Sequence, residues 1–214
     1  MKSLHRTDLF AWSAYQPQHR LDFNGFLWTR PGANVLVDPL PLGPGDAEHL
    51  AELGGVATIV LTNSAHVRGA RELAAASGAR LLGPRGEREG FPLRCDGWLG
   101  DGDEPVPGLV VRELHGSKTP GELALVLDGT TAIFGDLVRG HAADALVLLP
   151  DPKLRDIRQA VESVRRVRAL HPAVAHVLVG DGWCAFRRGG ELLDELLAAR
   201  GAAATAGSAA SRPA

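Results

Sequence analysis

The stretch VATIVLTNSAHVRGARELAAASGARLL, residues 56–82, decides the fold. Residues 56–61 form an apolar run with the length of a buried strand. A helical pattern then runs through 67–77 and stops at Gly78, and a second short apolar stretch follows at 79–82. Strand, polar loop, helix and strand in this order are typical of a β-α-β unit.

The same alternation of short apolar strands and helical patterns extends along the chain, so we predict an α/β fold. Further strands are expected at 9–14, 24–28, 34–37, 109–114, 123–127, 131–134 and 174–179. Further helices are expected from an N-cap at Asp46 to just before Gly54, at 153–170 and at 191–200.

Two segments lack such patterns. Residues 83–108 are rich in glycine, proline and charge, and we expect loops there with short strands around Leu93 and Leu99. Residues 201–214 are small and polar without periodicity, which predicts a disordered C-terminal tail. The chain is therefore predicted to be one domain, 1–200, followed by that tail.

Composition argues against several classes of partner. The 214 residues carry a net charge of −2 at pH 7, without the positive excess typical of proteins that bind nucleic acid or anionic membranes. The longest apolar runs fall far short of the roughly 20 residues that span a bilayer, and the start of the chain lacks the apolar stretch of a secretory signal. Cys95 and Cys184 match no zinc or redox spacing and are expected as free thiols. We predict a cytoplasmic protein that binds a small molecule, with no nucleic-acid or membrane partner.

Four polar loops stand out because each follows an apolar strand, where α/β proteins place their functional groups. They are the loops at 62–69, 116–121, 134–137 and 180–183. The second contains Thr119-Pro120-Gly121, the third a Gly-Asp pair and the fourth a Gly-x-Gly.

In order and spacing these loops resemble the motifs of the metallo-β-lactamase superfamily. That pattern has a threonine followed by His-x-His-x-Asp-His, then His-Thr-Pro-Gly, Gly-Asp and Gly-His-Gly. The resemblance covers about residues 9 to 190 and implies a four-layer αββα sandwich of the metallo-β-lactamase type, with the four loops meeting at one edge.

Most of the zinc-binding positions of that pattern hold other residues here. The resemblance places Asn63, Ala65, Val67 and Arg68 where the first loop carries its ligands, and Lys118 and Asp181 where later histidines stand. Only Asp136 is retained. Because zinc sites need about three or four Cys, His, Asp or Glu ligands, we predict no metal ligands and no cofactor.

The substitutions suggest a different kind of site. Lys118, Asp136 and Asp181 are predicted as the catalytic group, because an ammonium can neutralise two converging carboxylates as a metal ion does. The predicted substrate-binding residues are Asn63, His66, Arg68, Lys153 and Trp183. The function predicted is binding of a small anionic metabolite or a pseudo-hydrolase role. The alternative is a hydrolase of the superfamily with an altered metal or Lys/Asp site, so whether the chain is an enzyme stays open.

Ordinary structural roles also remain open. Asp136 and Asp181 suit turns, His66 suits the start of a helix, Lys153 suits a solvated surface, and Trp183 suits either the core or a pocket wall. The region that corresponds to the zinc site of the superfamily would then be filled only by salt-bridged side chains with a structural role. Stoichiometric zinc would instead indicate a site built from His66, Asp136 and Asp181.

Overall fold

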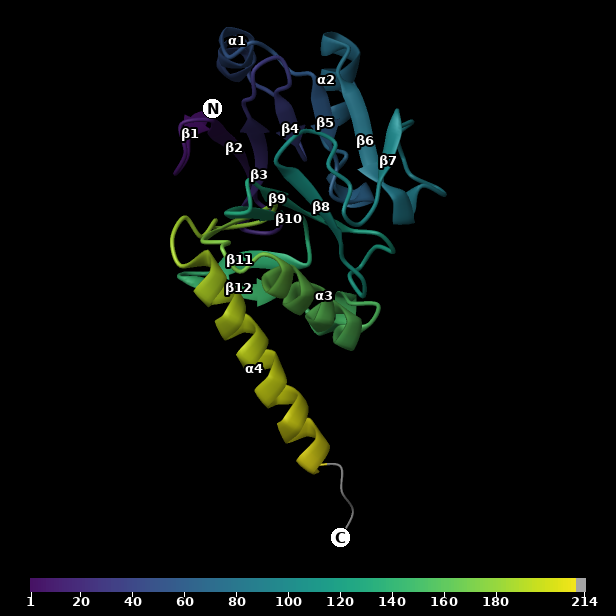
Figure 1. Ribbon diagram of the computed structural model, residues 1–214, viewed down its shortest axis with the longest axis vertical. Helices are drawn as coiled ribbons and strands as arrows, with labels where there is room; N and C mark the ends of the chain where they lie inside the picture. Colours follow the sequence, from purple (N-terminus) through teal and green to yellow (C-terminus); the bar gives the residue numbers. More distant parts are fainter. Residues whose placement is uncertain (211–214) are drawn as a thin grey trace.

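The structure is a computed structural model that describes residues 1–210, with side chains described to residue 202. Its strands form two large sheets and one hairpin (Figure 1). The seven-stranded sheet follows chain order, with strands β1 (Lys2–Ser3), β2 (Leu9–Gln16), β3 (Leu21–Trp28), β4 (Val35–Val37), β5 (Thr58–Val60), β6 (Arg80–Pro84) and β7 (Gly97–Leu99). Its first four strands pair antiparallel, and β4 to β7 pair parallel.

The second sheet has four strands in the order β13-β10-β9-β8. These are β8 (Leu109–Glu113), β9 (Leu123–Leu127), β10 (Thr131–Phe134) and β13 (His176–Val179). A separate hairpin consists of β11 (Val138–Ala142) and β12 (Ala145–Leu148).

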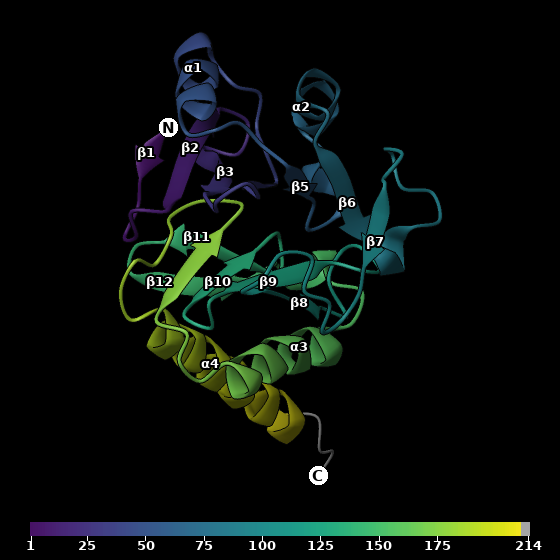
Figure 2. The ribbon, with the colours of Figure 1, turned by 45° about the horizontal axis from the view of Figure 1, so that its top comes forward.

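Helices cover the outer face of each sheet, as Figure 2 shows. The four helices are α1 (Pro44–Glu52), α2 (Ala70–Ser77), α3 (Ile157–Leu170) and α4 (Gly189–Ala210). Leu50 of α1 and Ala70 of α2 belong to the same buried cluster as Leu36 and Ile59 of the seven-stranded sheet. The four-stranded sheet packs in the same way against α3 and α4.

The alternation along β9 shows how the layers are held together. Leu123, Leu125 and Leu127 point to the core between the two sheets, whereas Ala124 and Val126 belong to the cluster under α3 and α4. Successive side chains of a strand point to opposite faces, so a strand buried on both faces is apolar throughout. The predicted four-layer αββα sandwich is confirmed.

Several element boundaries differ from the prediction. The helix expected from residue 153 begins at Ile157, because the Asp156 side chain accepts a hydrogen bond from the Gln159 amide and caps α3 there. The first helix begins with Pro44 after Gly43 instead of using Asp46 as its cap. The β11–β12 hairpin was not predicted, and no strand forms around Leu93.

The C-terminal helix α4 continues beyond residue 200 into the segment predicted as a disordered tail. The rest of that segment, residues 211–214, lies outside the described residues, so the boundary at 200 stays a prediction. Within the described part of the chain, no helix is both long enough and apolar enough to cross a membrane.

One glycine fixes the 116–121 loop against α3. Gly116 has φ of +81°, and a Cβ at this position would overlap the carbonyl oxygen of Asp156. Its own carbonyl oxygen accepts hydrogen bonds from the amides of Arg155 (3.0 Å) and Asp156 (3.2 Å). The absence of a side chain therefore allows the loop that carries Lys118 to lie directly on the start of α3.

We expect Gly116→Ala to destabilise the fold more than Gly129→Ala. Both glycines have positive φ, but a Cβ at Gly129 would meet nothing within 4 Å. Gly129→Ala should cost about 1 to 2 kcal/mol for the left-handed backbone alone, and Gly116→Ala about 1 to 3 kcal/mol more for the overlap. Urea unfolding of both variants measures the difference. Equal losses would contradict the close approach at Gly116.

Candidate functional site

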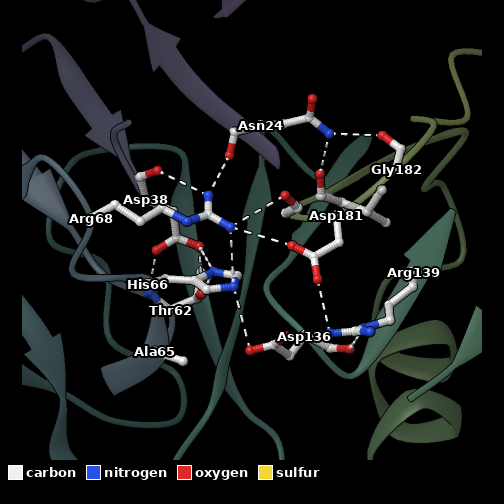
Figure 3. Close-up of polar contacts among 12 residues, drawn as sticks. Asn24, Asp38, Thr62, Ala65, His66, Arg68, Asp136, Arg139, Asp181 and Gly182 are labelled. Carbon is white, nitrogen blue, oxygen red and sulfur yellow. Dashed lines mark hydrogen bonds and ion pairs between the residues drawn. The ribbon is translucent and has the colours of Figure 1, made fainter. Parts of the chain in front are cut away.

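The four loops singled out in the sequence meet at one edge of the two sheets; Figure 3 shows the contacts among residues of three of them, 62–69, 134–137 and 180–183. Asn63, which follows β5, donates to Asp136 at the end of β10 across 3.2 Å. Lys118, from the loop between β8 and β9, reaches the same carboxylate. Arg68 donates to the carbonyl oxygen of Gly180 after β13 across 3.3 Å. Loops far apart in the sequence thus share one polar cluster.

Asp136 lies at the centre of this cluster and is almost fully buried, with 1% of its surface exposed. Its Oδ2 atom lies 2.6 Å from the Lys118 ammonium and 3.4 Å from His66 Nε2. Its Oδ1 atom accepts from Arg139 Nη2 across 2.7 Å. Burial opposes ionisation, but the electrostatic influence of His66 and Lys118 and the hydrogen bonds from Lys118 and Arg139 outweigh it, so the pKa of Asp136 is well below its usual range.

Asp181 is the second buried carboxylate of the cluster, with 4% of its surface exposed. Arg139 Nη2 lies 2.8 Å from its Oδ2, and Arg68 Nη2 lies 3.4 Å from its Oδ1. Arg139 therefore bridges Asp136 and Asp181 with a single nitrogen. Close packing of two carboxylates needs such a shared cation, because unpaired buried charges are strongly unfavourable.

His66 is oriented by Asp38, which follows β4. Its Nδ1 lies 2.8 Å from Asp38 Oδ2, and Asp38 also accepts from the amide and hydroxyl of Thr62. A carboxylate only accepts hydrogen bonds, so Nδ1 of the ring carries the proton and Nε2 is left with a free lone pair when His66 is neutral. In that state Nε2 accepts a hydrogen bond from Arg68 Nη2 across 3.2 Å and lies 3.4 Å from Asp136 Oδ2.

Arg68 lies behind the cluster and is directed at the backbone. Its guanidinium donates to the carbonyl oxygens of Asn24 (2.7 Å) and Asp38 (3.3 Å) as well as Gly180, and burial lowers its pKa. Its backbone has a positive φ of 33°. Arg68 thereby connects β3, the end of β4 and the loop after β13, and it does not line the cavity described next.

A cavity of about 140 Å³ opens beside the cluster. Its lining combines carboxylates with groups that can carry positive charge: His19, Leu21, Phe23, Ala65, His66, Lys118, Asp136, Arg139, His141, Lys153 and Asp181. Lys153 is exposed at its rim. Among the predicted site residues, Lys118, Asp136, Asp181, His66 and Lys153 therefore share one cavity.

The remaining predicted site residues lie outside this lining. Asn63 is fully buried, where it holds Asp136 and accepts from the Ala65 amide across 2.9 Å. Trp183 is 64% exposed and borders a neighbouring hollow together with Tyr15 and His141.

Arg139, Glu122 and Asp38 belong to the cluster or hold it in place but were not among the predicted site residues. Arg139 lies on β11, a strand that was not predicted. Glu122, directly after Thr119-Pro120-Gly121, is fully buried and accepts from the amides of Asp136 (2.7 Å) and Leu137 (2.8 Å) and from the Ser117 hydroxyl. Burial, together with the charge of Asp136, raises the pKa of Glu122 to about 7. The sequence around Arg139 and Glu122 has no alternation of polar and apolar residues that would have indicated a strand or a site there.

A family model described as the metallo-β-lactamase superfamily matches residues 1–200. The chain belongs to the metallo-β-lactamase superfamily. No curated protein sequence matches it.

Solved structures of the superfamily share the fold. The DIM-1 metallo-β-lactamase superposes with a TM-score of 0.73 at 17% identity, covering 92% of this chain and 95% of that chain. A metallo-β-lactamase from Pontibacter korlensis gives a TM-score of 0.72 at 16% identity, covering 91% and 95%. One from Erythrobacter litoralis, with β-mercaptoethanol in its active site, gives 0.74 at 15% identity, covering 92% and 95%.

The prediction that the chain lacks metal ligands and a cofactor is wrong. His66, Asp136 and Asp181 each offer a ligand atom, and these atoms lie within 4.8 Å of one another at three buried positions. The prediction failed because it carried ligands over by position, and His66 falls between the positions of the superfamily pattern. In the structure the turn Ser64–His66 directs this imidazole into the cluster.

These three residues fit a single metal ion. An unprotonated imidazole nitrogen and two carboxylates form a donor set that zinc accepts, and here the Arg68 guanidinium would have to release the nitrogen of His66. Asp38 supplies the outer carboxylate that commonly holds a ligating histidine in place. Among the described residues, His66, Asp136 and Asp181 are the one group of three such side chains whose ligand atoms lie close enough to hold a metal ion.

We expect the effect of Glu122→Gln on stability to depend on pH. The pKa of Glu122 is raised from 4.5 to about 7 in the folded protein, so the folded state binds this proton more tightly and the stability it contributes is lost as pH rises through that window. The variant cannot ionise at this position. It should therefore gain about 1 to 3 kcal/mol relative to the parent between the two pH values.

Denaturant unfolding of both proteins across this range measures the effect, with Glu89→Gln at an exposed position as the control. A stability difference that stays constant with pH would contradict the raised pKa of Glu122.

Proposed function

We propose that the chain is a small-molecule hydrolase of the metallo-β-lactamase superfamily with an altered site, in which His66, Asp136 and Asp181 hold one metal ion. The observation that carries the proposal is the approach of these three ligand atoms to within 4.8 Å of one another on the wall of a cavity. Three protein ligands with a further position open to solvent or substrate are typical of catalytic zinc sites.

A metal ion bound there would supply an activated water molecule and polarise a substrate oxygen. The residues of the chain would prepare the site for that chemistry. Asp38 fixes the ring of His66, and Arg139 holds Asp136 and Asp181 side by side. Glu122 fixes the backbone that carries Asp136 through two amide hydrogen bonds.

The cavity favours a substrate with an anionic group. Lys118 and Lys153 line it, and the Lys153 side chain is exposed and makes no described ion pair or hydrogen bond. His19 and His141 also border it. A carboxylate or phosphate group would pair with these side chains, while a volume of about 140 Å³ suits a small molecule or one end of a larger one.

A second candidate function is binding of a small anion without turnover, as in a pseudo-hydrolase. It is favoured by the ion pairs that the carboxylates already make: Asp136 with Lys118 and Arg139, and Asp181 with Arg139 and Arg68. These cations compete for the oxygen atoms that a catalytic metal needs.

We also propose a cytoplasmic location and a single domain over residues 1–200. The location is supported by Cys95 and Cys184, which are free thiols and suit a reducing compartment. The family match over residues 1–200 supports the domain limits.

Titration with zinc, monitored by calorimetry, should give a binding stoichiometry close to one ion per chain. Asp38→Asn should weaken zinc binding by about 10- to 100-fold, because it removes the charge of the carboxylate that orients His66 and replaces one of its two acceptor oxygens by an NH2 donor. Asp144→Asn, at an exposed position outside the cavity, should leave the affinity unchanged. No zinc binding by the parent chain would contradict the proposed site.

Hydrolysis is tested with a panel of small esters and amides that carry a carboxylate or a phosphate. The zinc-loaded chain should turn over at least one of them, and Asp136→Asn should lower kcat/KM by at least about 10- to 100-fold. Zinc binding without turnover of any substrate would favour the second candidate.

A further inference from the structure

One oxygen atom of the cluster has two competing uses. Asp136 Oδ2 lies 2.6 Å from the Lys118 ammonium, and the same oxygen lies 3.4 Å from His66 Nε2. An ion held by His66 and Asp136 would take a position between these two ligand atoms, with bonds of about 2.0 to 2.2 Å. The Lys118 ammonium therefore contacts the oxygen that the ion would use.

The two cations cannot share this oxygen without a large penalty. A protonated lysine has three donors and no lone pair, so it cannot join the ligand set. An ion and an ammonium on the same carboxylate oxygen would lie only a few ångströms apart in a buried setting, where like charges repel strongly. One of them must leave when the other is present.

Lys118 is the cation that is free to leave. Arg139 contacts the other oxygen of Asp136 and is held by the Asp136 carbonyl oxygen and by Asp181. Arg68 also contacts His66 Nε2 (3.2 Å) and Asp181 Oδ1 (3.4 Å), but three backbone carbonyl oxygens hold it in place. Lys118, in contrast, makes its one described side-chain contact with Asp136, and its side chain is 29% exposed on a flexible stem that borders the cavity.

We propose that the Lys118 ammonium and a metal ion occupy Asp136 Oδ2 alternately, so that Lys118 is a displaceable internal cation that sets the metal affinity of the site. This inference rests on the proposed metal site at His66, Asp136 and Asp181. By linkage, a bound ion weakens the Lys118–Asp136 pair by the same factor by which Lys118 weakens ion binding. Metal binding thereby releases an ammonium into the cavity, where it can pair with an anionic substrate.

Zinc affinities of Lys118→Met and Lys153→Met test the proposal. Both changes remove one positive charge from the same cavity, but only Lys118 contacts a ligand oxygen. We expect Lys118→Met to bind zinc roughly 5- to 150-fold more tightly than the parent chain, the range of a typical coupling between two sites. Lys153→Met should change the affinity by less than about threefold, because an exposed charge is screened by solvent and salt.

The possible outcomes separate this inference from the proposed function. Equal affinities of the parent and Lys118→Met, or equal gains in both variants, would overturn the displacement of Lys118 and leave the metal site intact. Failure of the parent and both variants to bind zinc would overturn the metal site and the displacement together.

A second measurement uses the unaltered chain and does not depend on how Lys118→Met folds. The chain has three lysines, Lys2, Lys118 and Lys153, so acetylation by an amine-reactive reagent is easily mapped by mass spectrometry. Zinc should increase the acetylation rate of Lys118 severalfold and leave the rates of Lys2 and Lys153 unchanged. A Lys118 rate that is unchanged or lowered by zinc would overturn the proposal.

Discussion

The buried carboxylate of Asp136 is the constraint on which the rest of the site depends. An ionised group with 1% exposure needs partners on both oxygens. Lys118 and Arg139 supply the charges, and Glu122 fixes the backbone on which Asp136 lies. Lys118 and Glu122 come from the loop between β8 and β9, and Arg139 comes from β11, so the requirement of one side chain draws separate segments of the chain together.

The fold makes these partners available because both sheets end at the same edge. Arg68 ties that edge together through the carbonyl oxygens of Asn24, Asp38 and Gly180, which belong to different strands or the loops after them. Asn24 adds hydrogen bonds to the carbonyl oxygens of Val179 and Gly182. These hydrogen bonds connect the two sheets beside the cavity, whereas the Lys118 and Lys153 side chains that line it are partly or fully exposed.

Much of this architecture could be predicted from local sequence patterns. The remaining features could not, because they depend on tertiary packing. The strands around 56–61 and 123–127 are apolar because both faces are buried, and loops at their ends could be expected to meet. The imidazole of His66 could not be placed from spacing, since its direction is set by the turn Ser64–His66 and by Asp38. Arg139 was not predicted as a site residue because the hairpin that carries it was not predicted. Arg68 was predicted to bind substrate; in the structure its guanidinium donates to backbone carbonyl oxygens and contacts His66 and Asp181, and Arg68 is not among the residues that line the cavity.

In the proposed site, His66, Asp136 and Asp181 hold one ion and Lys118 gives way to it. Anomalous X-ray diffraction from crystals soaked in zinc tests this claim most directly. The account predicts one peak at about 2.0 to 2.2 Å from His66 Nε2 and from an oxygen of each carboxylate, with the Lys118 ammonium turned away from Asp136. A Lys118–Asp136 contact that persists in zinc, with no peak at the three ligand atoms, would contradict it.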